Sequence, residues 1–166
     1  MSKVNILLSA STCYITEEFD YYGNPITHVV TTEEAFFIPF RAHKVIDVTL
    51  RTKGSDLKGS LRSARVLLRK TKLPPILVDS QERFILIPIY SSRHSQNTFF
   101  NPFNIIDIKQ VQPRKSIIIF LNGKTLTVPY SERAVYIKIY ESMKILQRII
   151  YYQKNPLYIE DYPKLI

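Results

Sequence analysis

Four basic side chains at helical spacing carry the clearest chemical signal in this sequence. They follow one another at steps of four, three and four residues: Lys58, Arg62, Arg65 and Arg69. They belong to a basic window, residues 41–72, which holds ten Lys or Arg against two Asp and therefore carries +8 of the chain's net charge of +9. Such a local concentration of positive charge attracts polyanions, and a phosphate polymer is the partner that it predicts.

The spacing of these cations fits a helix over residues 56–70, capped by Ser55. Gly59 weakens that helix by up to about 1 kcal/mol, and residues 65–70 could instead form a strand that places Arg65, Leu67 and Arg69 on one face. A solvated helix face is the ordinary meaning of a charge run, but no acidic residue stands four positions along the stripe to neutralise it. Anion binding is therefore the preferred interpretation.

Catalytic and metal-binding patterns are missing from the sequence. Residues 54–60 imitate a phosphate-binding loop, but Ser60 stands where a lysine must follow the second glycine. His43 and Asp47 lie one helical turn apart with no nucleophile placed to use them, so a surface hydrogen bond between them is preferred. The acidic pair at residues 17–18 lies beside a turn and is expected to be solvated. We expect no enzyme, no cofactor and no metal site.

Length and composition indicate one reduced, cytoplasmic domain. The 166 residues fit a single domain over residues 1–154 with a short tail over residues 155–166. Cys13 is the only cysteine, so no internal disulfide can form. Charged residues interrupt every apolar run before it reaches the roughly 18 residues that a membrane span needs, so no membrane partner is expected.

Hydrophobic periodicity predicts an α+β fold. Alternating apolar residues indicate strands at residues 4–8, 12–16, 26–31, 34–38, 76–78, 84–87, 105–111, 116–121 and 124–128. The first four would form an N-terminal hairpin layer, and the later ones an antiparallel β-sheet meander whose last turn is Asn122-Gly123. One or two short helices lie between the two groups in the basic window, and Gly54 ends the first of them.

A long C-terminal helix is predicted from its cap, Ser131, to Lys154. Its apolar residues exceed one stripe, so one face can pack on the sheet while the rest is exposed unless a second copy covers it. The candidate dimer interface is the following row: Val135, Ile139, Met143, Leu146 and Ile150. A helix sunk into the core of its own chain is an equal alternative.

A block of apolar residues and prolines fills the middle of the chain. It reads Lys-Leu-Pro-Pro-Ile-Leu-Val-Asp at residues 72–79, then Phe-Ile-Leu-Ile-Pro at 84–88, then Ser-Ser at 91–92. The block resembles the competence transcription factor family, ComK. Val-Ile-Asp at residues 45–47 and the Asn-Gly-Lys turn within 120–125 also agree with that family, and the resemblance covers roughly residues 45–146.

The resemblance implies a transcriptional activator of competence (DNA-uptake) genes that binds A/T-rich boxes of double-stranded DNA, largely through the minor groove, as associated dimers. It also implies contacts with RNA polymerase and with a proteolytic adaptor. Charge placement alone, and not the family motif, assigns the contacts. We expect arginines at the groove or its rim and lysines on the backbone: Arg51, Arg62, Arg65, Arg69, Lys53, Lys58, Lys70 and Lys72.

Two functions of other classes remain open. A basic rim beside a long helix also suits a peripheral adaptor on anionic membranes, which vesicle flotation would detect. A regulatory protein-interaction module without DNA binding is the third interpretation. The DNA-binding interpretation requires the basic residues to face one side of the fold, whereas scattered basic residues would favour the interaction module.

Overall fold

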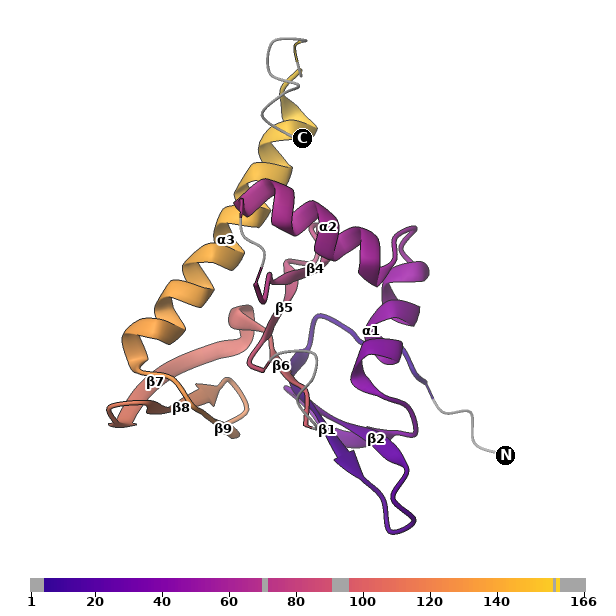
Figure 1. The fold of residues 1–166 in the computed structure, drawn as a ribbon, viewed down its shortest axis with the longest axis vertical. Coiled ribbons are helices and arrows are strands. Elements are labelled where there is room, and N and C mark those ends of the chain that lie inside the picture. The colour runs from indigo at the N-terminus through magenta and orange to yellow at the C-terminus, as the bar shows by residue number, and fades with distance from the viewer. Residues whose placement is uncertain (1–4, 70–71, 91–95, 157, 159–166) are drawn as a thin grey trace.

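The computed structural model of this chain describes residues 5–69, 72–90, 96–156 and 158. This part of the chain contains two antiparallel sheets and three α-helices (Figure 1). The helices are α1 (Ala42–Arg51), α2 (Leu57–Leu68) and α3 (Glu132–Lys154). The α+β fold class expected from the sequence is confirmed, including the long C-terminal helix capped by Ser131, whose hydroxyl accepts the N–H of Ala134 at 3.2 Å.

The larger sheet has six strands in the order β3-β2-β1-β6-β5-β4, and all neighbouring pairs are antiparallel. Its strands are β1 (Thr12–Phe19), β2 (Pro25–Thr31), β3 (Ala35–Ile38), β4 (Ile76–Asp79), β5 (Phe84–Pro88) and β6 (Thr98–Phe100). The first three form the expected N-terminal hairpin layer. A short 3₁₀ helix, Pro102–Asn104, then leads to the second sheet.

The smaller sheet is a meander of β7 (Ile105–Gln112), β8 (Lys115–Phe120) and β9 (Thr125–Val128). The turn between β8 and β9 holds Gly123 at a φ of +79°, a left-handed conformation that glycine adopts without strain. The expected meander is therefore confirmed for these three strands. It is wrong for β4 and β5, which belong to the larger sheet.

Strand β6 joins the two groups of strands, and the sequence analysis missed it. It has only three residues, too few to show a period, yet it pairs with β1 on one side and with β5 on the other. Phe99 faces one core and Phe100 the other, because successive side chains of a strand point to opposite faces. This short strand is what makes one sheet out of two hairpin groups.

The strand expected at residues 4–8 does not form in the described residues 5–8. Leu8 is buried, and its N–H donates to the Thr49 hydroxyl of α1 at 3.0 Å. Leu8 thus packs against α1, and residues 5–8 pair with no strand.

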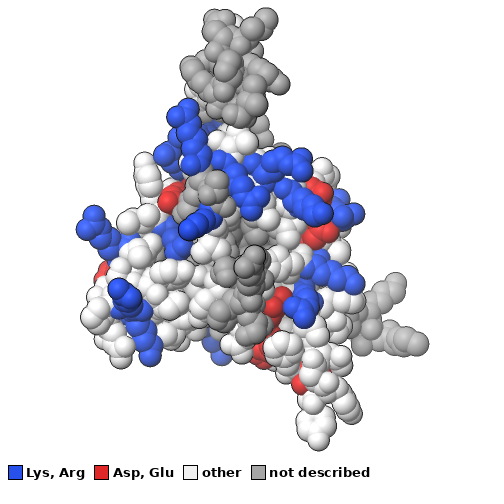
Figure 2. Space-filling view, in the orientation of Figure 1, with Lys and Arg blue, Asp and Glu red and all other residues white. Residues whose placement is uncertain are grey.

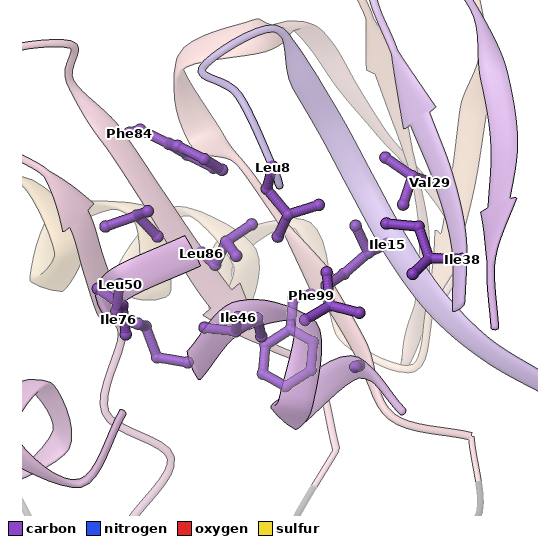
Figure 3. Close-up of a cluster of buried hydrophobic side chains, with 13 residues drawn as sticks. Leu8, Ile15, Val29, Ile38, Ile46, Leu50, Ile76, Phe84, Leu86 and Phe99 are labelled. Atoms are coloured by element: carbon purple, nitrogen blue, oxygen red, sulfur yellow. The ribbon is translucent and has the colours of Figure 1, made fainter. Parts of the chain in front are cut away.

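Two hydrophobic cores cover opposite faces of the larger sheet. One core lies between the sheet and helices α1 and α2 and includes Ile15, Ile46 and Phe99 (Figure 3). The other lies between the sheet, the smaller sheet and α3, and includes Phe100 and Phe120. Burial of each such side chain contributes about 1.5–3 kcal/mol to folding, so both layers are firmly attached to the sheet.

Glu17 is a buried carboxylate that caps α1 from a neighbouring strand. Only 2% of the residue is exposed, although the sequence analysis expected it to be solvated. Its Oε1 accepts the N–H of Ala42, the first residue of α1, at 2.9 Å, and its Oε2 accepts from Asn97 Nδ2 at 3.3 Å. A negative charge at this end of a helix is favourable, because the first N–H groups point toward it without helical partners. Glu17 therefore fixes α1 on β1.

Replacing this carboxylate is expected to destabilise the fold. Glu17→Ala leaves a buried N–H and a buried amide without acceptors, which should lower the free energy of unfolding by about 2–3 kcal/mol in urea titrations. Glu17→Gln keeps one acceptor and should cost less. The matched control is Glu18→Ala, a partly exposed neighbour whose carboxylate lies 3.7 Å from His28 Nδ1 at the surface, with an effect below about 0.5 kcal/mol. Equal effects at both positions would contradict the capping role.

Candidate nucleic-acid interface

Helix α2 carries the predicted stripe of cations. Lys58, Arg62 and Arg65 lie on the helix and are exposed, and Arg69 follows at its C-terminal cap, also exposed. Residues 65–68 are helical, so the strand considered over 65–70 is wrong for the described residues. Arg69 ends the helix in a left-handed conformation, with a φ of 52°. Leu57 and Leu61, on the neighbouring face of the helix, pack on the first core.

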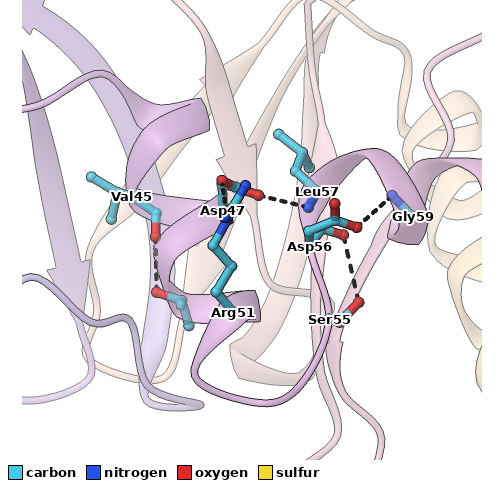
Figure 4. A network of polar contacts seen from close by, with 8 residues as sticks. Val45, Asp47, Arg51, Ser55, Asp56, Leu57 and Gly59 are labelled. Atoms are coloured by element: carbon cyan, nitrogen blue, oxygen red, sulfur yellow. Dashed lines mark hydrogen bonds and ion pairs between the residues drawn. The ribbon is translucent and has the colours of Figure 1, made fainter.

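The N-terminal cap of α2 is Asp56. The cap predicted from the sequence, Ser55, is wrong. The Asp56 Oδ1 atom accepts the N–H of Gly59 at 2.9 Å (Figure 4). Because the helix begins at Leu57, the carboxylate of residue 56 is the one that reaches the third residue of the first turn. It also places a negative charge at the positive end of the helix.

A second carboxylate ties α2 to α1. Asp47 Oδ1 accepts the N–H of Leu57 at 2.9 Å, and its Oδ2 accepts from Arg51 Nε at 2.9 Å (Figure 4). The hydrogen bond from the Leu57 backbone, together with Arg51 and the charge of Lys58, holds the pKa of Asp47 below its usual value, although partial desolvation opposes the shift. The start of α2 is thereby fixed relative to α1.

Asp47 does not form the predicted hydrogen bond with His43. His43 instead lies edge-on to Phe99, with ring centroids 5.7 Å apart. Asp47 is occupied by Leu57 and Arg51, which explains why no acid–base pair forms there.

Two of the predicted DNA-contacting residues form ion pairs within the protein. Arg51 pairs with Asp47 at 2.9 Å, and Lys53 Nζ lies 3.0 Å from Asp79 Oδ2. Burial alone would raise the pKa of Asp79, but hydrogen bonds from Lys53 and from two backbone N–H groups outweigh it and lower the pKa. Lys72 is exposed, whereas Lys70 lies outside the described residues. Arg51 and Lys53 thus link elements of the fold through these ion pairs, whereas the stripe lies on α2.

The basic surface also extends beyond the window. Figure 2 shows blue side chains across α2 and continuing toward α3. There Arg69 lies together with Lys144 and Arg148 of α3, which line the same groove. Neither α3 residue was predicted as a DNA contact, although their spacing of four places them on one side of a helix. Lys44, by contrast, lies over the ring of Phe40 at 4.2 Å in a separate depression next to the β1–β2 hairpin.

The predicted dimer row on α3 faces largely inward. Val135 and Leu146 are buried in the second core, and Ile139 and Ile150 are partly buried against it. These residues attach α3 to the sheets of its own chain, which is the alternative that the sequence analysis left open. The apolar residues that α3 exposes are others: Tyr136, Ile137, Tyr140 and Tyr151.

Other reactive groups do not assemble into a site in the described part of the chain. No group of three or more His, Cys, Asp or Glu residues there could hold a metal ion. Cys13 is fully buried, and burial raises the pKa of its thiol to about 11. No helix among the described residues is long and apolar enough to cross a membrane.

Comparison with known proteins agrees with the resemblance found in the sequence. The family model of the ComK protein matches residues 3–154. The chain belongs to the ComK family. The competence transcription factor of Bacillus subtilis (strain 168) is 23% identical to it over 133 residues, which are 80% of this chain and 68% of that protein. No solved structure matches the chain. Membership of the ComK family makes the chain a regulator of competence transcription.

The link between α1 and α2 is expected to depend on pH through Asp47. Asp47→Ala should lower the free energy of unfolding by about 1 kcal/mol at neutral pH, because the N–H of Leu57 loses its acceptor. The lowered pKa means that the charged carboxylate stabilises fully above its ordinary value of 3.8 and that this stabilisation is lost as the pH falls through the folded value. Urea titrations should therefore show a constant difference from about pH 5 to 7 that shrinks below about pH 4.

Asp47→Asn is the matched control, since it keeps an oxygen for Leu57 but carries no charge to titrate. Its stability difference from the wild type should be smaller than that of the alanine variant at pH 7. A difference between wild type and Asp47→Ala that grows as the pH falls would contradict the assignment.

Proposed function

We propose that this ComK family member regulates transcription by binding A/T-rich duplex DNA, with α2 as the main contacting element. The observation that supports the proposal is the composition of α2. The helix has Lys58, Arg62 and Arg65 on its exposed side, and no acidic residue occurs from Leu57 to Leu68. The positive charge of the helix therefore faces solvent, where it attracts polyanions such as a phosphate backbone.

The length of the stripe suits the minor groove. Arg69 lies eleven positions after Lys58, and at about 1.5 Å of rise per helical residue this spans roughly 16 Å. The minor groove is about 6 Å wide, so a stripe of this length crosses it and reaches the backbone on both sides. Narrow A/T-rich grooves concentrate negative potential and attract arginine. Arg62 and Arg65, in the middle of the stripe, are the residues placed to use it.

The remaining predicted contacts have different roles in this proposal. Arg51 and Lys53 must exchange Asp47 and Asp79 for phosphate oxygens, so breaking these ion pairs reduces what each contributes to binding. Lys72 is exposed and contributes a backbone contact at the edge of the surface.

A salt-dependent titration of the stripe tests this proposal. If about five phosphates are neutralised, the logarithm of the affinity for an A/T-rich duplex should fall with the logarithm of the salt concentration at a slope near −4.5. Arg62→Ala combined with Arg65→Ala should reduce the slope by about 1.8 and weaken the preference for A/T-rich over G/C-rich duplexes. Both side chains are exposed, so the thermal unfolding midpoint should change little.

The matched control replaces two exposed lysines of the smaller sheet, Lys109 and Lys115, with alanine. It removes the same charge and should leave the slope near the wild-type value. A wild-type slope near zero, or equal losses in the two double variants, would refute α2 as the contacting element.

We also propose that the protein self-associates through the exposed side of α3. Tyr136, Ile137 and Tyr140 are 50%, 50% and 67% exposed, and their spacing places them on one side of the helix. Large apolar side chains gathered on one helix face are typical of protein interfaces. A two-fold dimer would bring two α2 helices to one duplex.

Sedimentation velocity over a concentration series tests the association. The wild type should sediment faster as its concentration rises, and Ile137→Arg should weaken the association at least tenfold because it places a charge at the centre of the contact. Tyr21→Arg, a change on a hairpin tip that is 96% exposed, is the control and should behave as the wild type. A wild type that stays monomeric throughout would rule out this interface.

A further inference from the structure

The C-terminal end of α2 lies beside α3 (Figure 1). Residues of both helices line a basic groove there. Its volume is about 400 Å³, within the range of sites that accept ligand groups. Residues 66–68 of α2 form its apolar wall, and the polar side chains that line it are Arg69, Lys144, Arg148 and Tyr152. The groove thus combines three cations and one phenol, contributed by two helices, with no acidic residue in its lining.

The positive charge of the groove exceeds what is needed to neutralise the negative C-terminal ends of the two helices. The C-terminal end of α2 carries the equivalent of about half a negative charge, which the three cations exceed by more than two charges. Lys144 and Arg148 lie before the last turn of α3 and do not serve that helix end. Among the residues that the structure describes, Arg69, Lys144 and Arg148 form no ion pair with a carboxylate. The surplus charge is available to an external anion.

Arg69 connects the groove to the cationic stripe. It is the last residue of the stripe, and its left-handed backbone turns the chain at the point where α2 meets α3. The cations of the groove therefore continue the line of positive charge that begins at Lys58.

We infer that this groove holds backbone phosphates of the same DNA duplex that α2 contacts, so that α3 forms a second part of the nucleic-acid interface. The inference rests on the proposed function and adds residues of α3 to it. Arg148 can bind a phosphate through two parallel N–H groups, Lys144 supplies a point charge, and the Tyr152 hydroxyl can donate to a phosphate oxygen. The apolar wall at residues 66–68 offers contact to the sugars.

The inferred contact has a consequence for orientation. Phosphate contacts carry no sequence information but fix how a protein sits on the duplex. A helix that contacts DNA along one line can still roll about its own axis, whereas a second contact from α3 removes that freedom. The groove would thus position Arg62 and Arg65 over the minor groove.

The test uses the full-length protein with Lys144→Gln and Arg148→Gln combined, on an A/T-rich duplex. Loss of two phosphate contacts should reduce the salt slope by about 1.8 and weaken binding on the order of 10- to 100-fold at about 0.1 M salt. A hydroxyl-radical footprint should lose protection on the α3 side of each bound protomer. Lys109→Gln with Lys115→Gln removes equal charge from the smaller sheet and should change neither readout. Lys144→Arg alone keeps the charge and should bind as the wild type.

The outcomes separate this inference from the proposed function. If the α3 double variant keeps the wild-type slope and footprint while the α2 double variant loses affinity, the groove is not a phosphate site and the proposed function stands. If the wild type shows no salt-dependent binding to duplex DNA, both fail. Anionic vesicles that bind the wild type but not the α3 double variant, with DNA binding unchanged, would assign the groove to a membrane and overturn the inference.

Discussion

The cationic surface depends on two carboxylates at the start of α2. Asp56 accepts the N–H of Gly59 within the helix, and Asp47 accepts the N–H of Leu57 from the neighbouring helix. A helix of twelve residues is marginal in water on its own, so its orientation comes from such end contacts and from packing. With Leu57 and Leu61 on the first core, the same two bonds turn the cations outward. Protein stability and the proposed DNA contact are therefore linked through α2.

Acidic neighbours hold two cations of the basic window in ion pairs. Asp47 and Asp79 hold Arg51 and Lys53, and both carboxylates have lowered pKa values because they accept several hydrogen bonds. The stripe on α2 lies on a helix without acidic residues. The charge of the window is thus divided by structure into cations that join helices and strands and cations that face solvent. In the proposed function, the cations on α2 are the ones that attract phosphates.

Features set by local sequence were predictable, and features set by contacts between distant segments were not. The hairpin at Gly123, the long helix α3 and the spacing of the stripe follow from turn chemistry, capping and periodicity. Strand β6 has too few residues to show a period, and the burial of Glu17 depends on α1 lying over β1. The meeting of Arg69 with Lys144 requires the packing of α2 on α3, which lie far apart in sequence.

Site-specific photo-crosslinking tests the central claim most directly. A photoreactive phenylalanine analogue would replace Lys58 on the stripe of α2 or, in a second protein, Tyr21 on the hairpin tip, which is 96% exposed. With an A/T-rich duplex present, the account predicts efficient crosslinks to DNA from position 58 and none from position 21. Crosslinks from position 21 and none from position 58 would show that another face of the protein contacts DNA and would contradict the account.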